Sequence, residues 1–399
     1  MLYSTMAGEK VSRLGFGAMR LPLLEDGKTI DEAQVQKMVD LAIENGVNYF
    51  DTAFPYHGGN SELVTGKALK KYPRESFFLA DKFPGHQIQS SYDPAGIFEE
   101  QLEKCGVDYF DFYLLHNVNE SSEPTYRDPR WGIIDYFREQ KRLGRIRHLG
   151  ISTHGSPEMM KEFLDSMGED IEFCQIQINY LDWTLQDAKA KLELLKERNI
   201  PVIAMEPVRG GKLANLPSEA HEKLQGLRPG QSDASWGYRW LQQFPEIRVV
   251  LSGWSNLEQT KDNIRTFSEG EPLSEQENAV LADIAESLKD SIPCTACRYC
   301  CEGCPMQLDI PDLIAKYNDY RMAPSINVSM YIEQLAADKQ PSACIGCGKC
   351  VKVCPQNINV PEALHAFADS LKSRPSWAEL SRQRELEAME LRKKREAQK

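Results

Sequence analysis

Two copies of one cysteine pattern constrain what this chain can fold into more than any other feature. Eight of its eleven cysteines follow the spacing C-x2-C-x2-C-x3-C-P, which starts once at Cys294 and again at Cys344. Three closely spaced thiolates can bind three irons of one cubane, while the fourth cysteine reaches the other cluster. The pattern therefore predicts two [4Fe–4S] clusters with crossed ligands: Cys294, Cys297, Cys300 and Cys354 on one, and Cys344, Cys347, Cys350 and Cys304 on the other.

The repeat continues beyond the cysteines, because the segment 304–312 matches 354–362 position for position. Such internal symmetry suits a domain built as two related halves. In each half a proline followed by an acid opens a stretch of helical pattern, which fits the first turn of a helix. The segment 294–370 resembles the α-helical dicluster ferredoxin domain. We expect a linking helix within 268–293 before it and a charged tail over 371–399 after it, as a solvated or frayed helix, with a docking arm as the alternative.

Zinc ribbons and disulfides are the alternative interpretations of these cysteines. Zinc sites favour separated pairs of ligands rather than a run of three thiolates followed by Cys-Pro. Disulfides require an oxidising compartment, and the segment 1–12 is polar with no apolar export signal. We therefore expect clusters and a reducing, cytoplasmic environment. Cys105 and Cys174 are expected to be packed thiols, and Cys301 lies off the spacing.

Length and charge limit the remaining possibilities. A chain of 399 residues is long enough for two domains, one of them large. No apolar stretch is long enough to span a bilayer. The formal net charge of −12 argues against a nucleic-acid partner or an anionic membrane surface.

Up to about Phe267, short apolar runs alternate with amphipathic helical patterns. Eight strands alternating with eight helices predict a (β/α)8 barrel over residues 1–267. A doubly wound sheet is the alternative, although no G-x-G-x-x-G follows the first strand. The expected strands are 14–19, 47–51, 77–82, 109–116, 146–152, 173–178, 201–206 and 247–252. The expected helices are 31–45, 62–71, 95–104, 133–143, 158–167, 185–198, 233–243 and 257–266.

Four residues at or just after three consecutive strand ends form a chemically coherent set. Enzymes on this barrel carry their chemistry at the C-terminal ends of the strands. Asp51 and Tyr56 follow the second strand, Lys82 ends the third and His116 ends the fourth. A buried ammonium lowers the pKa of a neighbouring phenol and makes it a usable proton donor, while a neutral histidine can polarise a carbonyl. Each residue alone has a structural explanation, but together they predict a catalytic site.

These residues, within Phe50-Asp51-Thr52-Ala53, Tyr56, Lys82 and Leu115-His116, are similar to the tetrad motifs of the aldo/keto reductases. The resemblance covers about the first two-thirds of the chain and includes the opening segment 11–21 and the segment 149–152. With the cysteine runs, the whole resembles the bacterial and archaeal branch that carries a 4Fe–4S ferredoxin domain. It implies a carbonyl or alcohol substrate and an extended NADP or NAD cofactor across the barrel mouth.

The resemblance also implies where that cofactor lies. The nicotinamide carboxamide would meet Ser152 and Gln175. Thr153 stands where many members have asparagine, and Met205 where an aromatic ring often stacks on the nicotinamide. The pyrophosphate is expected near Gly210, Gly211, Lys212 and Leu213 and near Gly253, Ser255 and Asn256, and the adenine near Gln259 and Asn263.

Two functions remain open at this stage. The first is an iron–sulfur oxidoreductase whose barrel moves a hydride between NAD(P)H and a carbonyl or alcohol. The second is an electron-transfer protein whose barrel is a scaffold or binding module. A hydride carries two electrons and a cluster passes one, so direct exchange is poor without a flavin. The clusters are therefore expected to be structural, or to work with a ferredoxin or flavoprotein partner.

Overall fold

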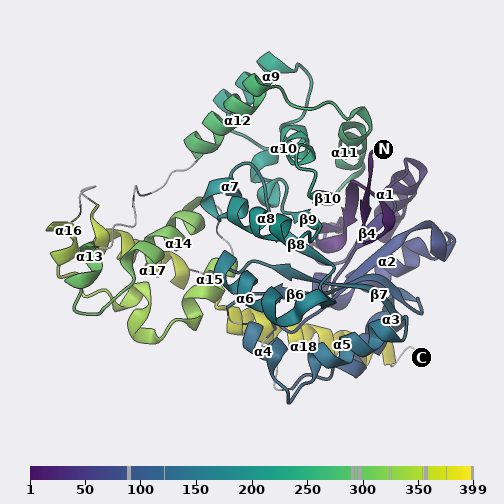
Figure 1. The fold of residues 1–399 in the computed structure, drawn as a ribbon, viewed down its shortest axis with the longest axis horizontal. Coiled ribbons are helices and arrows are strands. Elements are labelled where there is room, and N and C mark those ends of the chain that lie inside the picture. Colours follow the sequence, from purple (N-terminus) through teal and green to yellow (C-terminus); the bar gives the residue numbers. More distant parts are fainter. Residues whose placement is uncertain are drawn as a thin grey trace. The chain divides into compact units, whose positions relative to one another are not determined.

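The computed structural model describes residues 1–87, 91–120, 122–288, 292, 294, 299–322, 324, 326–352, 354, 358–373 and 375–396. The chain forms two compact units (Figure 1). The first consists of Met1–Ala282 together with Glu387–Lys399, and the second is Asp283–Leu386. The domain boundaries expected from the sequence stay predictions, and the units differ from them most at the C-terminus. No helix in the described part of the chain is long and apolar enough to cross a membrane.

The first unit is a closed barrel of eight parallel strands, which confirms the predicted (β/α)8 fold. The strands neighbour one another in chain order, and the last pairs with the first: Val250 lies opposite Leu14 and Gly253 opposite Gly17. The strands are β3 (Leu14–Gly17), β4 (Tyr49–Asp51), β5 (Phe78–Phe83), β6 (Phe110–Val118), β7 (Ile146–Thr153), β8 (Phe173–Gln177), β9 (Val202–Met205) and β10 (Ile247–Gly253).

Helices follow the strands and cover the outside of the barrel. Each of the eight expected helices is present within a few residues of its expected bounds. Several begin at capping side chains; Asp93, for example, accepts a hydrogen bond from the Gly96 amide. The helices are α1 (Glu32–Glu44), α2 (Ser61–Leu69), α3 (Pro94–Cys105), α5 (Ile133–Arg142), α6 (Pro157–Met167), α8 (Ala188–Glu197), α10 (Asp233–Gln242) and α11 (Leu257–Glu269), with α4 (Glu123–Arg127), α7 (Asp182–Leu185) and α9 (Ser218–Leu227) in the loops.

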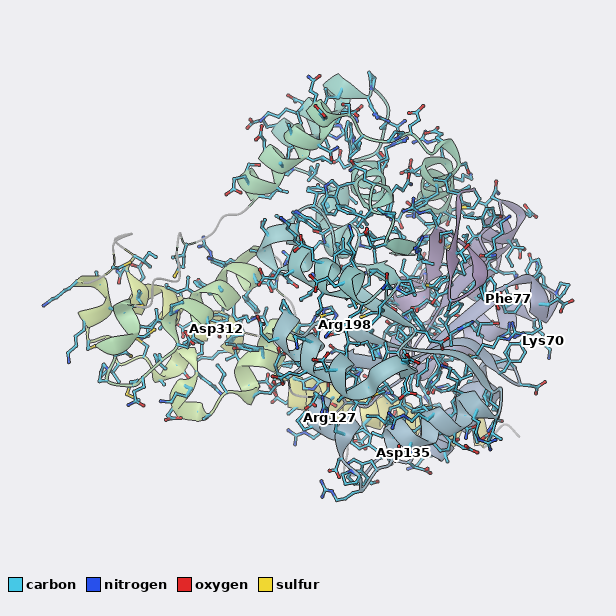
Figure 2. All side chains as sticks on the ribbon, in the orientation of Figure 1. Lys70, Phe77, Arg127, Asp135, Arg198 and Asp312 are labelled. Atoms are coloured by element: carbon cyan, nitrogen blue, oxygen red, sulfur yellow. The ribbon has the colours of Figure 1, made fainter. Side chains whose placement is uncertain are left out.

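A hairpin that the sequence did not suggest precedes the barrel. Its strands β1 (Tyr3–Met6) and β2 (Glu9–Ser12) pair antiparallel. Met6 and Val11 pack against Tyr49, Phe112 and other residues that the strands direct into the barrel. The hairpin therefore closes the end opposite the loops that carry Tyr56 and His116. Lys70 and Phe77, labelled in Figure 2, flank the α2–β5 connection at this closed end.

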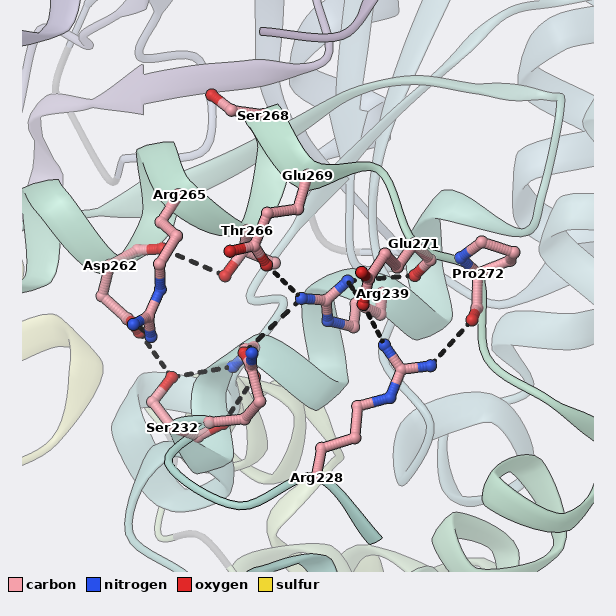
Figure 3. Close-up of polar contacts among 12 residues, drawn as sticks. Arg228, Ser232, Arg239, Asp262, Arg265, Thr266, Ser268, Glu269, Glu271 and Pro272 are labelled. Atoms are coloured by element: carbon pink, nitrogen blue, oxygen red, sulfur yellow. Dashed lines mark hydrogen bonds and ion pairs between the residues drawn. The ribbon is translucent and has the colours of Figure 1, made fainter.

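A network of arginines and acids fastens the segment through which the chain leaves the barrel (Figure 3). Arg239 on α10 has a fully buried side chain and donates to the Glu271 carbonyl (3.0 Å) and to Glu269 Oε2 (2.7 Å). Arg228 donates to the Pro272 carbonyl and to Glu277 Oε2, each at 2.9 Å. The connection between α11 and α12 (Glu275–Leu288) is thereby tied to α10.

We expect Arg239→Met to lower the free energy of unfolding of the barrel by about 2 kcal/mol, since buried hydrogen bonds and a charge pair are lost while water still reaches Glu269. The matched control is Arg265→Ala, which removes an exposed pair with Asp262 and should cost less than about 0.5 kcal/mol. The shift in urea midpoint, followed by circular dichroism, measures both. Equal shifts in the urea midpoint would show that the Arg239 network stabilises the barrel no more than an exposed ion pair does.

The second unit is helical throughout its described residues and repeats in structure as it does in sequence. Helices α13 (Tyr299–Glu302) and α14 (Ile310–Met322) correspond to α16 (Lys349–Lys352) and α17 (Val360–Lys372) at the interval that separates Cys304 from Cys354. One apolar core joins the halves, with Tyr317 stacked on Phe367 at 5.0 Å between ring centroids. Two further helices, α15 (Ile326–Gln334) and the first part of α18 (Trp377–Glu396), complete the unit.

Candidate functional site

The structure brings Asp51, Tyr56, Lys82 and His116 together at the open end of the barrel. Lys82 is fully buried, and its ammonium pairs with the Asp51 carboxylate. The same Nζ donates to the Thr52 carbonyl at 2.7 Å and lies 3.4 Å from the Tyr56 hydroxyl. Tyr56 begins a short 3₁₀ turn (Tyr56–Gly59) directly after β4, and this turn delivers its phenol to the ammonium.

The electrostatics of this group follow from burial and the single cation. Burial raises the pKa of Tyr56 above its ordinary value, and the positive charge of Lys82 offsets only part of that rise. Burial alone would lower the pKa of Lys82, but the charges of Asp51 and Tyr56 outweigh it, so the ammonium pKa is raised. The phenol is therefore a neutral donor beside a permanent cation; the charge of Lys82 lowers its pKa, as expected from the sequence, but burial raises it by more.

A second histidine that the sequence reading missed lies beside the tetrad. The His116 ring is T-shaped against Tyr56 with centroids 5.7 Å apart, and His86 lies against His116 at 4.5 Å. His86 comes from the loop after β5, and no local motif marked it. Tyr92 and Trp131, 5.6 Å apart, add aromatic surface in the neighbouring loops. The site therefore combines a proton donor with imidazole and aromatic surface.

The two residues expected at the nicotinamide carboxamide have different environments. Gln175 on β8 is 2% exposed, and its Oε1 has no hydrogen-bond partner within the described residues. Its Nε2 faces the Met205 sulfur at 3.5 Å. Ser152 Oγ already accepts from the Asn117 amide at 2.7 Å and so secures the residue after His116. A buried acceptor without a partner fits a ligand amide, and Gln175 is the better candidate.

The glycines expected near a pyrophosphate lie in two loops bridged by Arg20. Gly210 and Gly211 have φ of 64° and 95°, a conformation that favours glycine. A β-carbon on Gly210 would lie 3.2 Å from Arg20 Nη2, and one on Gly253 would lie 3.2 Å from the Arg20 side chain. Arg20 also pairs with Glu206 at 3.5 Å. Its position between both loops makes it a candidate phosphate ligand that the sequence reading did not single out.

The residues of the loop after β10 differ in how accessible they are. Asn256 caps α11 by accepting from the Gln259 amide at 2.8 Å, and Gln259 Oε1 accepts from the Ser255 amide at 2.9 Å. Gln259 remains exposed on the surface. Asn263 is 3% exposed and donates to Ser252 Oγ at 3.2 Å. Asn263 thus lies on the inner side of α11, and its contact with an adenine stays a prediction. Leu213 is fully buried, and Lys212 lies in the same 3₁₀ turn as the two glycines.

In the second unit, four cysteines line one cavity of about 340 Å³, counting the solvent at its mouth. They are Cys344, Cys347 and Cys350 from the second run and Cys304 from the first, the set expected to share a cluster. Gly346 and Gly348, with φ of 67° and 69°, let the chain curl between the cysteines. No three Cys, His, Asp or Glu among the described residues converge on a point that one ion could occupy. Four thiolates are the donor set that a [4Fe–4S] cluster takes, so the chemistry of this lining fits such a cluster.

The other expected set is described in part. Cys294, Cys300 and Cys354 all belong to or pack against the core of the second unit, although the first two lie far from the third in sequence. Cys297 lies outside the described residues, as does Pro355 of the repeat. Cys301 also packs against this core. In the barrel, Cys105 and Cys174 are buried thiols, as expected.

Known families match both units. The Aldo/keto reductase family matches residues 13–286, and a 4Fe-4S dicluster domain matches residues 293–358. An uncharacterized oxidoreductase of Bacillus subtilis, YqkF, is 27% identical over 299 residues, covering 67% of this chain and 90% of that protein. The NADH-specific methylglyoxal reductase of Escherichia coli is 25% identical over 287 residues, covering 61% and 85%.

Solved structures agree with the barrel assignment. The holo form of aldo-keto reductase AKR11C1 from Bacillus halodurans is 27% identical, has a TM-score of 0.58 and covers 71% of this chain and 96% of that one. The thermostable aldo-keto reductase Tm1743, in complex with the inhibitor epalrestat, shares the fold at 23% identity with a TM-score of 0.58, over 71% of this chain and all of that one.

Proposed function

The chain belongs to the aldo/keto reductase family, and on that premise we propose that its barrel reduces a small carbonyl compound with NAD(P)H, or oxidises the corresponding alcohol. The single observation that carries the proposal is the Asp51–Lys82–Tyr56 group at the open end of the barrel, with His116 against the phenol. The relatives' reductase names support this class of reaction but do not supply the substrate.

Each residue has a role that follows from its surroundings. The Tyr56 phenol is neutral near pH 7 and donates its proton to the carbonyl oxygen. Lys82 stabilises the phenolate that this transfer leaves behind, and Asp51 keeps the ammonium charged and oriented. The His116 imidazole orients the substrate oxygen by a hydrogen bond.

The barrel residues fit a nicotinamide cofactor, which would supply the hydride. Gln175 offers a buried acceptor to the carboxamide, and Met205 beside it offers soft apolar contact to the ring. Gly211 has open space where a β-carbon would point, and the Arg20 side chain beside Gly210 and Gly253 offers a cation to a phosphate. NAD and NADP both fit this description.

We expect Gln175→Leu to raise the KM for NAD(P)H about tenfold, with a smaller effect on kcat, because it removes a hydrogen bond made equally in ground and transition states. The control is Gln243→Leu, which breaks a surface pair with Asn278 and should leave both constants unchanged. Steady-state kinetics and fluorescence titration of the cofactor measure the effect. An unchanged KM would remove Gln175 from the cofactor site.

We propose that the second unit binds two [4Fe–4S] clusters through the crossed cysteine sets. When bound, such clusters supply one-electron chemistry. The cysteine-lined cavity supports one of the two sites directly. Two tests separate a reductase from an electron-transfer protein with a barrel scaffold. Bleaching of cluster absorbance by NAD(P)H alone favours electron transfer. Substrate-dependent NAD(P)H oxidation by protein with damaged clusters favours the reductase. If the clusters are redox-active rather than structural, we propose that a ferredoxin or flavoprotein partner couples them to the barrel.

A further inference from the structure

The C-terminal residues of the chain return to the barrel. Helix α18 is strongly polar, and residues from Glu387 onward belong to the barrel unit, although the helix begins in the cluster unit. The sequence predicted a solvated or frayed tail here. None of the tetrad chemistry requires this segment, so its position against the barrel needs a separate explanation.

The segment packs over the turn that carries Tyr56. A β-carbon built on Gly58 would lie 3.8 Å from Leu391 Cδ1 and 3.9 Å from Glu387 Oε2, which is ordinary van der Waals contact. The guanidinium of Arg392 lies over the Phe54 ring at 5.7 Å. Gly58 and Phe54 each lie two residues from Tyr56, on opposite sides in sequence. The tail therefore contacts Phe54 through Arg392 and lies beside Gly58, on either side of Tyr56 in sequence.

Arg392 is also the outer member of a row of alternating charges. Arg392 Nη2 pairs with Glu100 Oε2 at 2.6 Å, and Glu100 approaches Lys104 at 3.6 Å. Lys104 pairs in turn with the fully buried Glu62. The Lys104 ammonium lies 4.5 Å from the centroid of the Phe54 ring, so two cations contact this ring.

We propose that Arg392 is a positioning residue, which holds the segment 54–59 and thereby fixes Tyr56 at its distance from Lys82. We call these contacts the clamp. Its buried half is the pair Lys104–Glu62, and its outer half is the pair Arg392–Glu100. Only the catalytic consequence of the proposal depends on the proposed function of Tyr56. The contact itself can be tested without any substrate.

The outer half of the clamp is adjustable because it is exposed. The side chains of Arg392 and Glu100 are 44% and 25% exposed, while those of Lys104 and Glu62 are 5% and 0%. Pairs exposed to solvent contribute little and are screened by salt, whereas buried pairs are screened much less. We therefore expect loss of Arg392 to loosen the turn without unfolding the barrel.

The experiment compares Arg392→Ala, Arg392→Lys and the control Lys393→Ala in the full-length, iron-loaded protein. Lys393 is the adjacent exposed cation on the same helix, so it controls for net charge. Hydrogen–deuterium exchange is measured on the segment 54–60, whose Tyr56 and Asn60 amides donate to Ala53 and His57 carbonyls. Arg392→Ala should speed this exchange about two- to tenfold, Arg392→Lys should restore part of the protection, and Lys393→Ala should change nothing.

Exchange in β6 and the iron content serve as internal references and should not change. Raising the salt concentration of the parent protein to about 0.5 M should speed exchange in the same segment, because the outer pair is screened. Unchanged exchange at 54–60 in Arg392→Ala would overturn the proposal that Arg392 positions this segment. Equally faster exchange throughout the barrel would also overturn it, because the substitution would then destabilise the barrel as a whole.

Kinetics then test the catalytic consequence. Arg392→Ala should lower kcat about two- to tenfold with the cofactor KM unchanged. Faster exchange with unchanged kcat would overturn the positioning role if Tyr56→Phe is inactive. An active Tyr56→Phe would instead refute the proposed function and leave the clamp to be judged by exchange alone.

Discussion

Tyr56→Phe should reduce the rate of carbonyl reduction by about 10² to 10⁴-fold, which is the usual contribution of a positioned general acid. Phenylalanine keeps the ring against His116, so the pocket shape and the contacts to a nicotinamide are retained. The Kd for NAD(P)H should therefore stay nearly the same while kcat falls. Stopped-flow or steady-state assays on a screen of small aldehydes and ketones, paired with fluorescence titration of NAD(P)H, measure the two quantities.

The matched control is Tyr72→Phe, whose hydroxyl donates to Asp40 at 2.7 Å on the barrel surface. It should be as active as the parent. Lys82→Met should be nearly as damaging as Tyr56→Phe, because the phenolate left after proton transfer would lose its only adjacent cation within the described site. If both tetrad variants turn over carbonyls normally, the barrel uses other residues or serves as a scaffold.

Cys304→Ser should remove the same cluster as Cys347→Ser, although one cysteine belongs to the first run and the other to the second. Both line the cavity of the second unit, so each substitution withdraws one thiolate from the same donor set. The parent should contain about eight irons and eight sulfides per chain, and each variant about four if the other cluster survives. Iron and sulfide analysis with electron paramagnetic resonance of the reduced protein identifies which cluster remains.

Cys301→Ser is the control for this series, because Cys301 lies off the ligand spacing and should be dispensable for both clusters. Cys354→Ser should match Cys294→Ser in the remaining signal, as the crossed arrangement requires. Stoichiometric zinc in the anaerobically purified protein would contradict the assignment. So would loss of different clusters from Cys304→Ser and Cys347→Ser.

The sequence predicted the barrel well because its strands are short, fully buried and separated by amphipathic helices. The run Phe77–Lys82 became β5 (Phe78–Phe83), for example, and its buried lysine reaches Asp51 from the neighbouring strand. Strand order follows from this alternation, and strand order brings the tetrad together. The hairpin β1–β2 escaped prediction because its strands are partly exposed and do not alternate with helices.

Site residues whose positions depend on loop geometry could not be predicted from the alternation of strands and helices. Arg20 and His86 lie in loops after strands, and only the three-dimensional arrangement brings them beside Gly210 and His116. The direction of a side chain on a helix also depends on packing, and Asn263, whose contact with a ligand stays a prediction, donates to Ser252. The sequence identified the cation that lowers the pKa of Tyr56, but not the extent of burial, which raises that pKa by more.

The return of the chain to the barrel at Glu387 makes the cluster unit an insertion rather than an appendage. The ribosome therefore completes both cysteine runs before it releases the segment Glu387–Lys399, which belongs to the barrel unit. Chain synthesis takes about 0.05 to 0.2 s per residue, so the C-terminal segment of the barrel unit emerges several seconds after the strands have been made. Ending a gene after residue 282 would remove the Glu387–Lys399 part of the barrel unit together with the cluster unit. A faithful excision would instead join residue 282 to 387 through a new linker.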